Sequence, residues 1–230
     1  KSVLGSSYTQ KGRSGFRGKG SCLLHRKGEK QMQPLELYIH IPFCVKKCAY
    51  CDFLSGPAGE KEKEEYVKML VDEIRNCPDT VQNYRVISIF FGGGTPSLLT
   101  GEQIGRLMDT VREIFTLDED AEITMEMNPG TVTEEKLRKY RQAGVNRLSI
   151  GLQSVNDEEL RLLGRIHTYE EFREAYHLAR ANGFSNINVD LISAIPGQTV
   201  ESWRRTLEQV MALSPEHISA YSLILEEGTT

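Results

Sequence analysis

The amino-acid sequence predicts an α/β fold built on a parallel β-sheet. Its 230 residues, 39% of them apolar, are enough to bury one substantial core. Short β-rich runs alternate with longer amphipathic stretches six times after residue 34. Such alternation requires right-handed crossovers between parallel strands, so the sheet is either doubly wound or curled toward a barrel.

Each element has its own sequence signal. The strands are rich in β-branched and aromatic residues and are expected at 35–41, 86–91, 121–127, 147–150, 186–191 and 217–222. The helices between them are expected at 60–76, 101–115, 133–143, 156–182 and 199–212. Thr133 ahead of two glutamates is a typical N-cap, and Gly144 and Gly183 are typical helix stops. Gly164 predicts a break within the fourth helix.

The first 33 residues differ from the rest of the chain. They hold eight Lys or Arg and one acidic residue, are rich in Gly and Ser, and show no hydrophobic period. This composition is typical of disorder and also fits an organelle transit peptide. Met32 raises another hypothesis, that residues 1–31 are translated upstream sequence. We therefore expect a disordered basic head over residues 1–33 and a folded core over residues 34–230.

Charge, hydropathy and cysteine content restrict the class of protein. The formal net charge is -4 although the head is basic, so the folded part is acidic and a poor candidate for nucleic-acid binding. No apolar run approaches the roughly 20 residues of a membrane-spanning helix. Five cysteines, three of them clustered, do not resemble a secreted disulfide framework. These features favour a cytoplasmic protein without a transmembrane segment.

Polar and Gly-rich segments follow five of the predicted strands. They are the cysteine segment after strand one, "FGGGTP" at 91–96, "EMNPG" at 126–130, "GLQS" at 151–154 and Asp190. The carboxyl ends of parallel strands meet at one edge, where ligands of α/β proteins collect. The sequence therefore predicts that these residues form one rim.

Cys44, Cys48 and Cys51 have C-x3-C-x2-C spacing, and no fourth cysteine lies nearby. Soft thiolates suit zinc or an iron-sulfur cluster. Structural zinc needs four closed ligands, and neither Cys22 nor Cys77 is well placed to be the fourth. Three thiolates holding a four-iron cluster would leave one iron open to another ligand. A cluster is the favoured interpretation, with zinc as the alternative.

These segments resemble the radical S-adenosylmethionine (SAM) superfamily, whose signature is this cysteine spacing after the first strand of a six-fold βα partial barrel. "LYIHIPFC", "FGGGTPS", "SIGLQS" and "IPGQT" are similar to the branch that contains oxygen-independent coproporphyrinogen III dehydrogenase and a heme chaperone. The resemblance covers residue 35 onward. It implies a partial TIM-type barrel in which Cys44, Cys48 and Cys51 hold a 4Fe-4S cluster. The cluster would supply the electron that cleaves SAM to methionine and a 5′-deoxyadenosyl radical.

The resemblance also implies the residues that contact SAM. They are Tyr38, Tyr50, Gly92, Gly93, Gly94, Thr95, Glu126, Gln153, Arg165 and Asp190. The glycines let backbone approach the ligand, the Arg165 guanidinium suits a carboxylate, and the acidic side chains suit ribose hydroxyls or an ammonium. The alternatives are a flexible turn for the glycines, rim salt bridges for the polar residues and strand packing for Tyr38.

Phe53 separates the two functions within this branch. The dehydrogenase motif continues C-x3-C-x2-C-x-C, and Phe53 stands at that last position. The resemblance therefore favours a heme chaperone that delivers heme to acceptor proteins. The alternative is an oxygen-independent coproporphyrinogen III oxidase, which converts propionate side chains to vinyl groups by radical oxidative decarboxylation. Both imply an electron donor such as flavodoxin or ferredoxin. Family members continue into a C-terminal domain that this chain lacks, so heme binding is expected of the full-length protein.

Overall fold

The computed structural model describes residues 32–224. The chain divides into two units, Lys1–Gln31 and Met32–Thr230. The expectation of a disordered head over residues 1–33 and the hypothesis that residues 1–31 are translated upstream sequence fall outside the described residues up to residue 31, whereas Gln33 belongs to a strand. The account below concerns the second unit.

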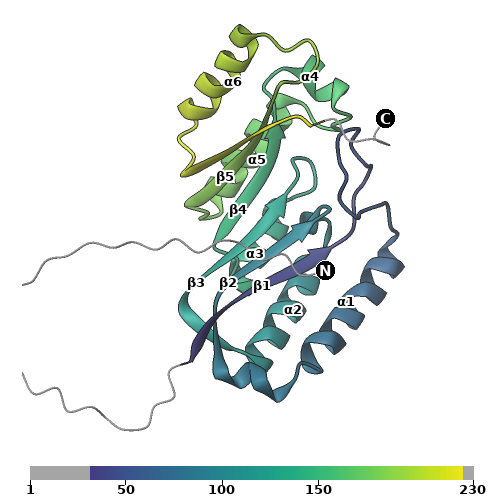
Figure 1. The fold of residues 1–230 in the computed structure, drawn as a ribbon, viewed down its shortest axis with the longest axis vertical. Helices are drawn as coiled ribbons and strands as arrows, with labels where there is room; N and C mark the ends of the chain where they lie inside the picture. Colours follow the sequence, from purple (N-terminus) through teal and green to yellow (C-terminus); the bar gives the residue numbers. More distant parts are fainter. Residues whose placement is uncertain (1–31, 225–230) are drawn as a thin grey trace, which may run out of the picture. The chain divides into compact units, whose positions relative to one another are not determined.

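Six parallel strands form a single sheet whose spatial order follows the sequence, β1-β2-β3-β4-β5-β6 (Figure 1). They are β1 (Gln33–Ile41), β2 (Tyr84–Gly93), β3 (Thr116–Met127), β4 (Arg147–Gln153), β5 (Asn186–Ser193) and β6 (His217–Ser222). Each neighbouring pair is parallel. The sheet curls into a half-barrel, which confirms the predicted partial TIM-type barrel and excludes the doubly wound alternative, in which the strand order would reverse.

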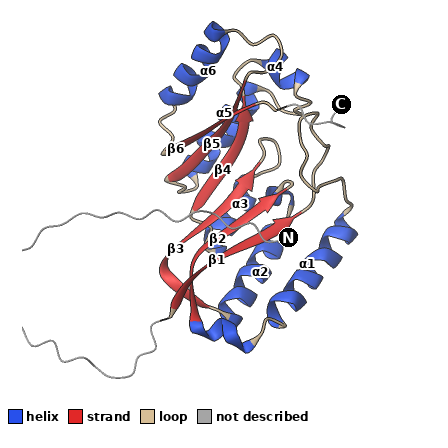
Figure 2. Ribbon diagram, viewed as in Figure 1, coloured by secondary structure: helices blue, strands red, loops and turns tan. Residues whose placement is uncertain are grey.

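The helices pack on the convex face of this sheet (Figure 2). They are α1 (Glu60–Arg75), α2 (Gly101–Ile114), α3 (Glu134–Ala143), α4 (Asp157–Leu162), α5 (Tyr169–Ala181) and α6 (Val200–Ala212), with 3-10 turns η1 (Asp79–Asn83) and η2 (Pro96–Leu98). Four of them begin at a threonine whose hydroxyl accepts a backbone N–H, which satisfies one orphan donor of the first turn. No helix in the described range has the length and apolar composition needed to cross a bilayer.

The core lies between the helices and the convex face. Ile89, Phe91 and Met125 of the sheet and Leu107 of α2 are fully or almost fully buried there. Burying each such side chain stabilises the fold by about 1.5–3 kcal/mol. Side chains alternate along a strand, so the residues between these core positions face the concave side. There Asn188 donates a hydrogen bond to the Ser149 hydroxyl at 2.8 Å, which gives the concave face a polar, hydrogen-bonded character.

Several strands are longer than predicted, and the largest difference is at β3. β3 begins at Thr116, five residues before the predicted start, because Thr116 pairs with Arg85 and the Arg85 guanidinium forms an ion pair with Asp118 at 3.0 Å. The helix expected over 156–182 is two helices, and the predicted break at Gly164 is confirmed. Gly164 has a φ of +74°, and a Cβ there would lie 3.2 Å from the Ala49 nitrogen. A glycine is therefore required where this loop meets the cysteine segment.

Candidate functional site

The rim predicted from the strand ends is the wall of one cavity of about 460 Å³. Eleven of the thirteen predicted site residues line it: Cys44, Cys48, Tyr50, Cys51, Gly93, Gly94, Thr95, Glu126, Gln153, Arg165 and Asp190. They come from the ends of β2 to β5 and from the loops after β1 and α4. The structure thus brings together residues that are far apart in the sequence.

The cysteine segment is held by backbone hydrogen bonds within its own loop and by one to the end of α4. The Cys44 N–H donates to the Gly56 carbonyl at 2.9 Å, and the Ala49 N–H donates to the Leu163 carbonyl at 3.1 Å. A third bond, 3.2 Å long, closes the turn from the Cys51 N–H to the Cys48 carbonyl. All three thiols are free and half-buried, and burial raises the pKa of Cys51.

Two of the three sulfur atoms accept hydrogen bonds from side chains in the cavity. The Thr95 hydroxyl donates to Cys44 Sγ at 3.6 Å, and Arg165 Nη1 donates to Cys48 Sγ at 3.7 Å. Donors aimed at sulfur stabilise bound thiolate and are a common feature around iron-sulfur clusters. The residues present therefore fit a cluster held by three thiolates.

The same region offers little for a closed zinc site. Cys77 Sγ donates to the Glu73 carbonyl on α1, and Cys77 does not line the cavity. Within residues 32–224, no three Cys, His, Asp or Glu side chains are arranged to share one metal ion. Cys22, the other thiol considered as a fourth ligand, lies outside the described residues.

Arg165 lines the cavity and has an unused donor. Its Nη2 donates to Asn128 Oδ1 at 2.5 Å and to the Gly151 carbonyl at 2.8 Å. Its Nε is buried and has no hydrogen-bond partner among the described residues. Leaving such a donor unpaired costs about 1–3 kcal/mol, more for a charged group. An acceptor on a ligand, such as the SAM carboxylate, would remove that cost, so Arg165 fits the role that the resemblance implies.

Two carboxylates, Glu126 and Asp190, also line the cavity. Burial raises the pKa of Glu126 to about 7; the Gly93 N–H, which donates to Glu126 Oε2 at 3.0 Å, opposes the shift, and Asp190 adds to it. Burial also raises the pKa of Asp190, although Ser149 and Asn188 donate hydrogen bonds to it. Both groups would be stabilised as carboxylates by ligand hydroxyls or an ammonium.

The glycines of "FGGGTP" are required by the fold as well as by any ligand. Gly93 has a φ of +115°, and a Cβ there would lie 2.4 Å from the His40 ring. A Cβ on Gly94 would lie 2.6 Å from the Phe43 carbonyl oxygen. The close approach between this loop and the segment after β1 therefore depends on the absence of side chains.

Tyr38 and Gly92 are the two predicted residues that do not line the cavity. The Tyr38 ring stacks on Phe90 with centroids 6.0 Å apart, and its hydroxyl lies 3.4 Å from His40 Nδ1. A Cβ on Gly92 would lie 2.7 Å from the Phe90 ring. Gly92 thus makes room for Phe90 beside Tyr38.

Gln153 shows local backbone strain at the cavity. It has a φ of +76°, in the left-handed region that costs a non-glycine residue about 1–2 kcal/mol. The β4–β5 register shifts between Gly151 and Gln153, so a bulge at the end of β4 aims the side chain. Such strain persists only where the surrounding structure enforces it, and it is found most often at active sites and ligand-binding sites.

Eleven further residues line the cavity without having been predicted as site residues for it: Lys46, Phe53, Met127, Asn128, Ser149, Gly151, Ile192, Tyr221, Ser222, Leu223 and Ile224. Asn128 lies within "EMNPG", and Ser149 shares a strand face with Gly151. Their positions near the carboxyl ends of predicted strands could have identified both as site residues. Phe53, Tyr221 and Ile224 are exposed apolar residues at the cavity mouth; the cysteine motif marks the position of Phe53, and no local pattern marks the other two.

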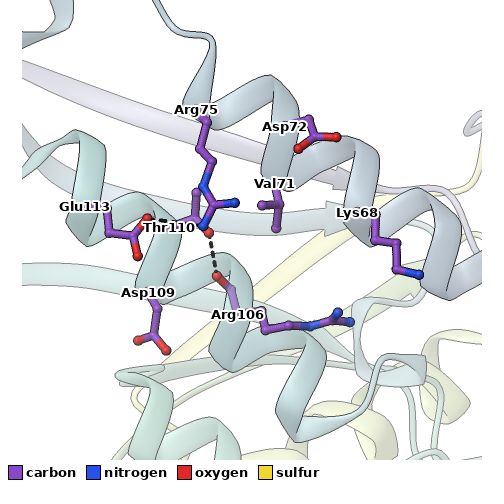
Figure 3. Close-up of a pocket in the computed structure, with 8 residues that line it drawn as sticks. All are labelled: Lys68, Val71, Asp72, Arg75, Arg106, Asp109, Thr110 and Glu113. Carbon is purple, nitrogen blue, oxygen red and sulfur yellow. Dashed lines mark hydrogen bonds and ion pairs between the residues drawn. The ribbon is translucent and has the colours of Figure 1, made fainter.

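A second cavity of about 550 Å³ lies between α1 and α2 (Figure 3). Lys68, Asp72, Arg75 and Glu113 are among its lining residues, and the Arg75 guanidinium forms an ion pair with Glu113 at 3.4 Å. No predicted site residue lines it. Six of its eight lining residues are charged, three of each sign, which is ordinary surface chemistry.

The half-barrel and the three thiols at its carboxyl edge define the class. Residues 38–210 match the model of the radical SAM superfamily, and the chain belongs to that superfamily. Among curated proteins it is similar to the heme chaperone HemW of Escherichia coli, with 46% identity over 200 residues, covering 86% of this chain and 53% of that protein. It is 38% identical over 193 residues to HemW of Bacillus subtilis, covering 84% and 51% of the two chains.

Solved structures agree with this assignment. Coproporphyrinogen III oxidase (HemN) from Escherichia coli, described as a radical SAM enzyme, has a TM-score of 0.78 and 37% identity, with 84% of this chain and 45% of that chain covered. Streptococcus suis SuiB bound to S-adenosylmethionine has a TM-score of 0.59 and 17% identity, covering 86% and 43%, and shares the fold. The chain spans about half the length of the curated relatives that it matches.

Proposed function

We propose that this chain is the SAM- and cluster-binding core of a heme chaperone. The observation that carries the proposal is that one cavity is lined by three free thiols, an arginine with an unpaired donor and two half-buried carboxylates. The similarity to heme chaperones over most of the chain supplies the link to heme. We also propose that the protein is cytoplasmic and receives electrons from a flavodoxin or ferredoxin.

In this proposal each group at the cavity has one task. Cys44, Cys48 and Cys51 hold a 4Fe-4S cluster and leave one iron open. When bound, the cluster supplies an electron for reductive cleavage of SAM. Arg165 pairs the SAM carboxylate, because its free Nε and its planar fork suit that group.

The other predicted residues complete the SAM site. Glu126 and Asp190 take ribose hydroxyls or the ammonium, and the backbone at Gly93 and Gly94 approaches the methionyl part. Thr95 and Gln153 add polar contacts. Tyr50 lines the cavity beside the thiols, whereas Tyr38 and Gly92 support the wall from outside it.

The mouth of the cavity suits an apolar, planar ligand. Phe53 is 65% exposed, Tyr221 63% and Ile224 69%, and all three line the cavity. Exposed apolar side chains grouped at one opening are typical of a binding surface. Lys46, which lines the same cavity, supplies a cation for carboxylate side chains of heme or a porphyrinogen.

A second candidate is the oxygen-independent coproporphyrinogen III oxidase. The similarity to HemN in structure and sequence favours it. Phe53 speaks against it, since the resemblance implies a cysteine at this position for that reaction. The chaperone is therefore the primary proposal.

Anaerobic reconstitution with iron and sulfide tests the cluster. We expect four irons per chain and, after reduction, an EPR signal that SAM alters. Replacing Cys44, Cys48 or Cys51 with Ala should abolish the signal, whereas Cys77→Ala, which changes a free thiol outside the cavity, should preserve it. A single bound zinc in place of iron would contradict the proposal.

The chaperone and the oxidase are then separated by ligand. Titration of the full-length protein with heme should give a shifted Soret band for a chaperone, and coproporphyrinogen III should yield no vinyl product. Formation of that product, with CO2 and 5′-deoxyadenosine in matching amounts, would establish the oxidase instead.

A further inference from the structure

We propose that Asn128 is a positioning residue that directs hydrogen bonds onto the thiolates and thereby raises the reduction potential of the cluster. It lies just after β3 and touches no thiol itself. Its side-chain amide joins Arg165 on one side to Thr95 on the other. The inference rests on the proposed function, because it concerns a cluster held by Cys44, Cys48 and Cys51.

The direction of each hydrogen bond follows from the chemistry of the groups. The Arg165 guanidinium can only donate, so the amide atom that faces it is the oxygen, Oδ1, at 2.5 Å. The amide nitrogen of Asn128 must then face Thr95, and it donates to Thr95 Oγ1 at 3.1 Å. An amide nitrogen cannot accept, so the hydroxyl proton of Thr95 is left for another acceptor.

That acceptor is a thiolate. Thr95 Oγ1 lies 3.6 Å from Cys44 Sγ, and Thr95 is only 2% exposed, so water does not compete for its proton. Arg165 also reaches Cys48 Sγ directly at 3.7 Å. Arg165 therefore donates directly to Cys48 Sγ. By fixing the orientation of the Asn128 amide, it also directs the Thr95 hydroxyl toward Cys44 Sγ.

Asn128 is itself held in place by the loops around it. Its backbone N–H donates to the Ser97 hydroxyl at 3.2 Å, and its carbonyl accepts from the Thr131 hydroxyl at 2.7 Å. The Lys136 ammonium from α3 donates to the Thr131 carbonyl at 2.9 Å and also to the Ser97 carbonyl. Because both loops are fixed to α3, the amide of Asn128 has little freedom to turn over.

Hydrogen bonds to sulfur stabilise the more negative, reduced state of a cluster more than the oxidised state. Losing the bond to Cys44 should therefore make reduction harder. A hydrogen bond to a charged acceptor corresponds to about a tenfold change in an equilibrium constant. For a one-electron couple, a tenfold change is about 59 mV toward negative potential.

The test is a dithionite redox titration of the reconstituted protein, followed by EPR, with SAM affinity measured by equilibrium dialysis. In Thr95→Val the proton donor to Cys44 is gone, and we expect the equilibrium constant for reduction of the cluster to fall about tenfold. Thr95→Ser keeps the hydroxyl and should keep the wild-type potential. Thr110→Val, another buried threonine but on α2, is the matched control and should not shift it.

Asn128→Asp should reverse the hydrogen bond between residue 128 and Thr95. The new carboxylate can still accept from Arg165, but it attracts the Thr95 proton away from Cys44. We expect Asn128→Asp to lower the reduction potential of the cluster. The decrease should be larger when Thr95 is present than in the Thr95→Val background, where only the added charge acts. Equal shifts in the two backgrounds, or a wild-type potential in Thr95→Val, would overturn the inference.

Failure of the proposed function would look different. In that case the wild-type chain forms no cluster and yields no potential. If Thr95→Val does not retain a cluster, Thr95→Ala provides the same loss of the hydroxyl with less bulk near the thiolate.

Discussion

Glu126 is expected to make the stability of this protein depend on pH, and Glu126→Gln should remove that dependence. The pKa of Glu126 is raised from 4.5 to about 7 in the fold, mainly by burial. Since one pKa unit corresponds to 1.36 kcal/mol, this shift amounts to about 3.4 kcal/mol. The glutamine can still accept the Gly93 N–H, so that hydrogen bond survives the substitution.

The sign follows from which state holds the proton more tightly. The folded-state pKa lies above the unfolded-state value, so as the pH rises the unfolded chain releases this proton first. Ionisation of Glu126 therefore lowers the stability of wild type between about pH 4.5 and pH 7. Asp190, whose charge raises the Glu126 pKa further, and Tyr38, which lies close enough to interact with that charge, are present in both proteins.

Urea unfolding followed by circular dichroism, with no iron or SAM added, measures this difference. Glu126→Gln should be more stable than wild type by about 0.5 kcal/mol at pH 4.5 and by about 3 kcal/mol at pH 8. Glu119→Gln, at an exposed position on the same strand, is the control and should show no such trend. A difference for Glu126→Gln that stays constant from pH 4.5 to pH 8 would refute the reasoning.

Three further substitutions probe buried polar groups. Thr206 is fully buried and its hydroxyl has no partner among the described residues, so Thr206→Val should stabilise the fold by about 1–2 kcal/mol in urea unfolding. Tyr140→Phe leaves the Leu99 carbonyl without its 2.6 Å donor and should cost about 1–3 kcal/mol; no loss would show that the bond is dispensable. Burial lowers the pKa of His167 from 6.5 to about 4, so the unfolded chain takes up this proton first, and from pH 6.5 to pH 4 wild type should lose about 3 kcal/mol of stability relative to His167→Leu. His167→Leu should lack that loss, and a parallel decline in both proteins would contradict the assignment.

Local signals identified the elements because each depends on neighbouring residues. The strands at 147–150 and 217–222 lie within or coincide with β4 and β6. The early start of β3 could not be predicted, because residues 116–120 are mostly polar and pair only because Arg85 lies opposite. The choice between a doubly wound sheet and a half-barrel was also undecided by alternation alone, since both use the same crossovers.

The sequence by itself determined the chemistry of this protein: three closely spaced thiols, a glycine loop and polar residues at successive strand ends. The thiols and glycines are close to one another in the sequence. The polar residues are expected to meet because parallel strands end at one edge of the sheet. Only the tertiary structure decided which groups meet. Asn128 lies 37 residues from Arg165 and 33 from Thr95, and its amide acquires a direction only when the curl of the sheet brings all three together. Hydrogen bonds act over about 3 Å, so the pairing of such distant residues depends on strand register and loop closure.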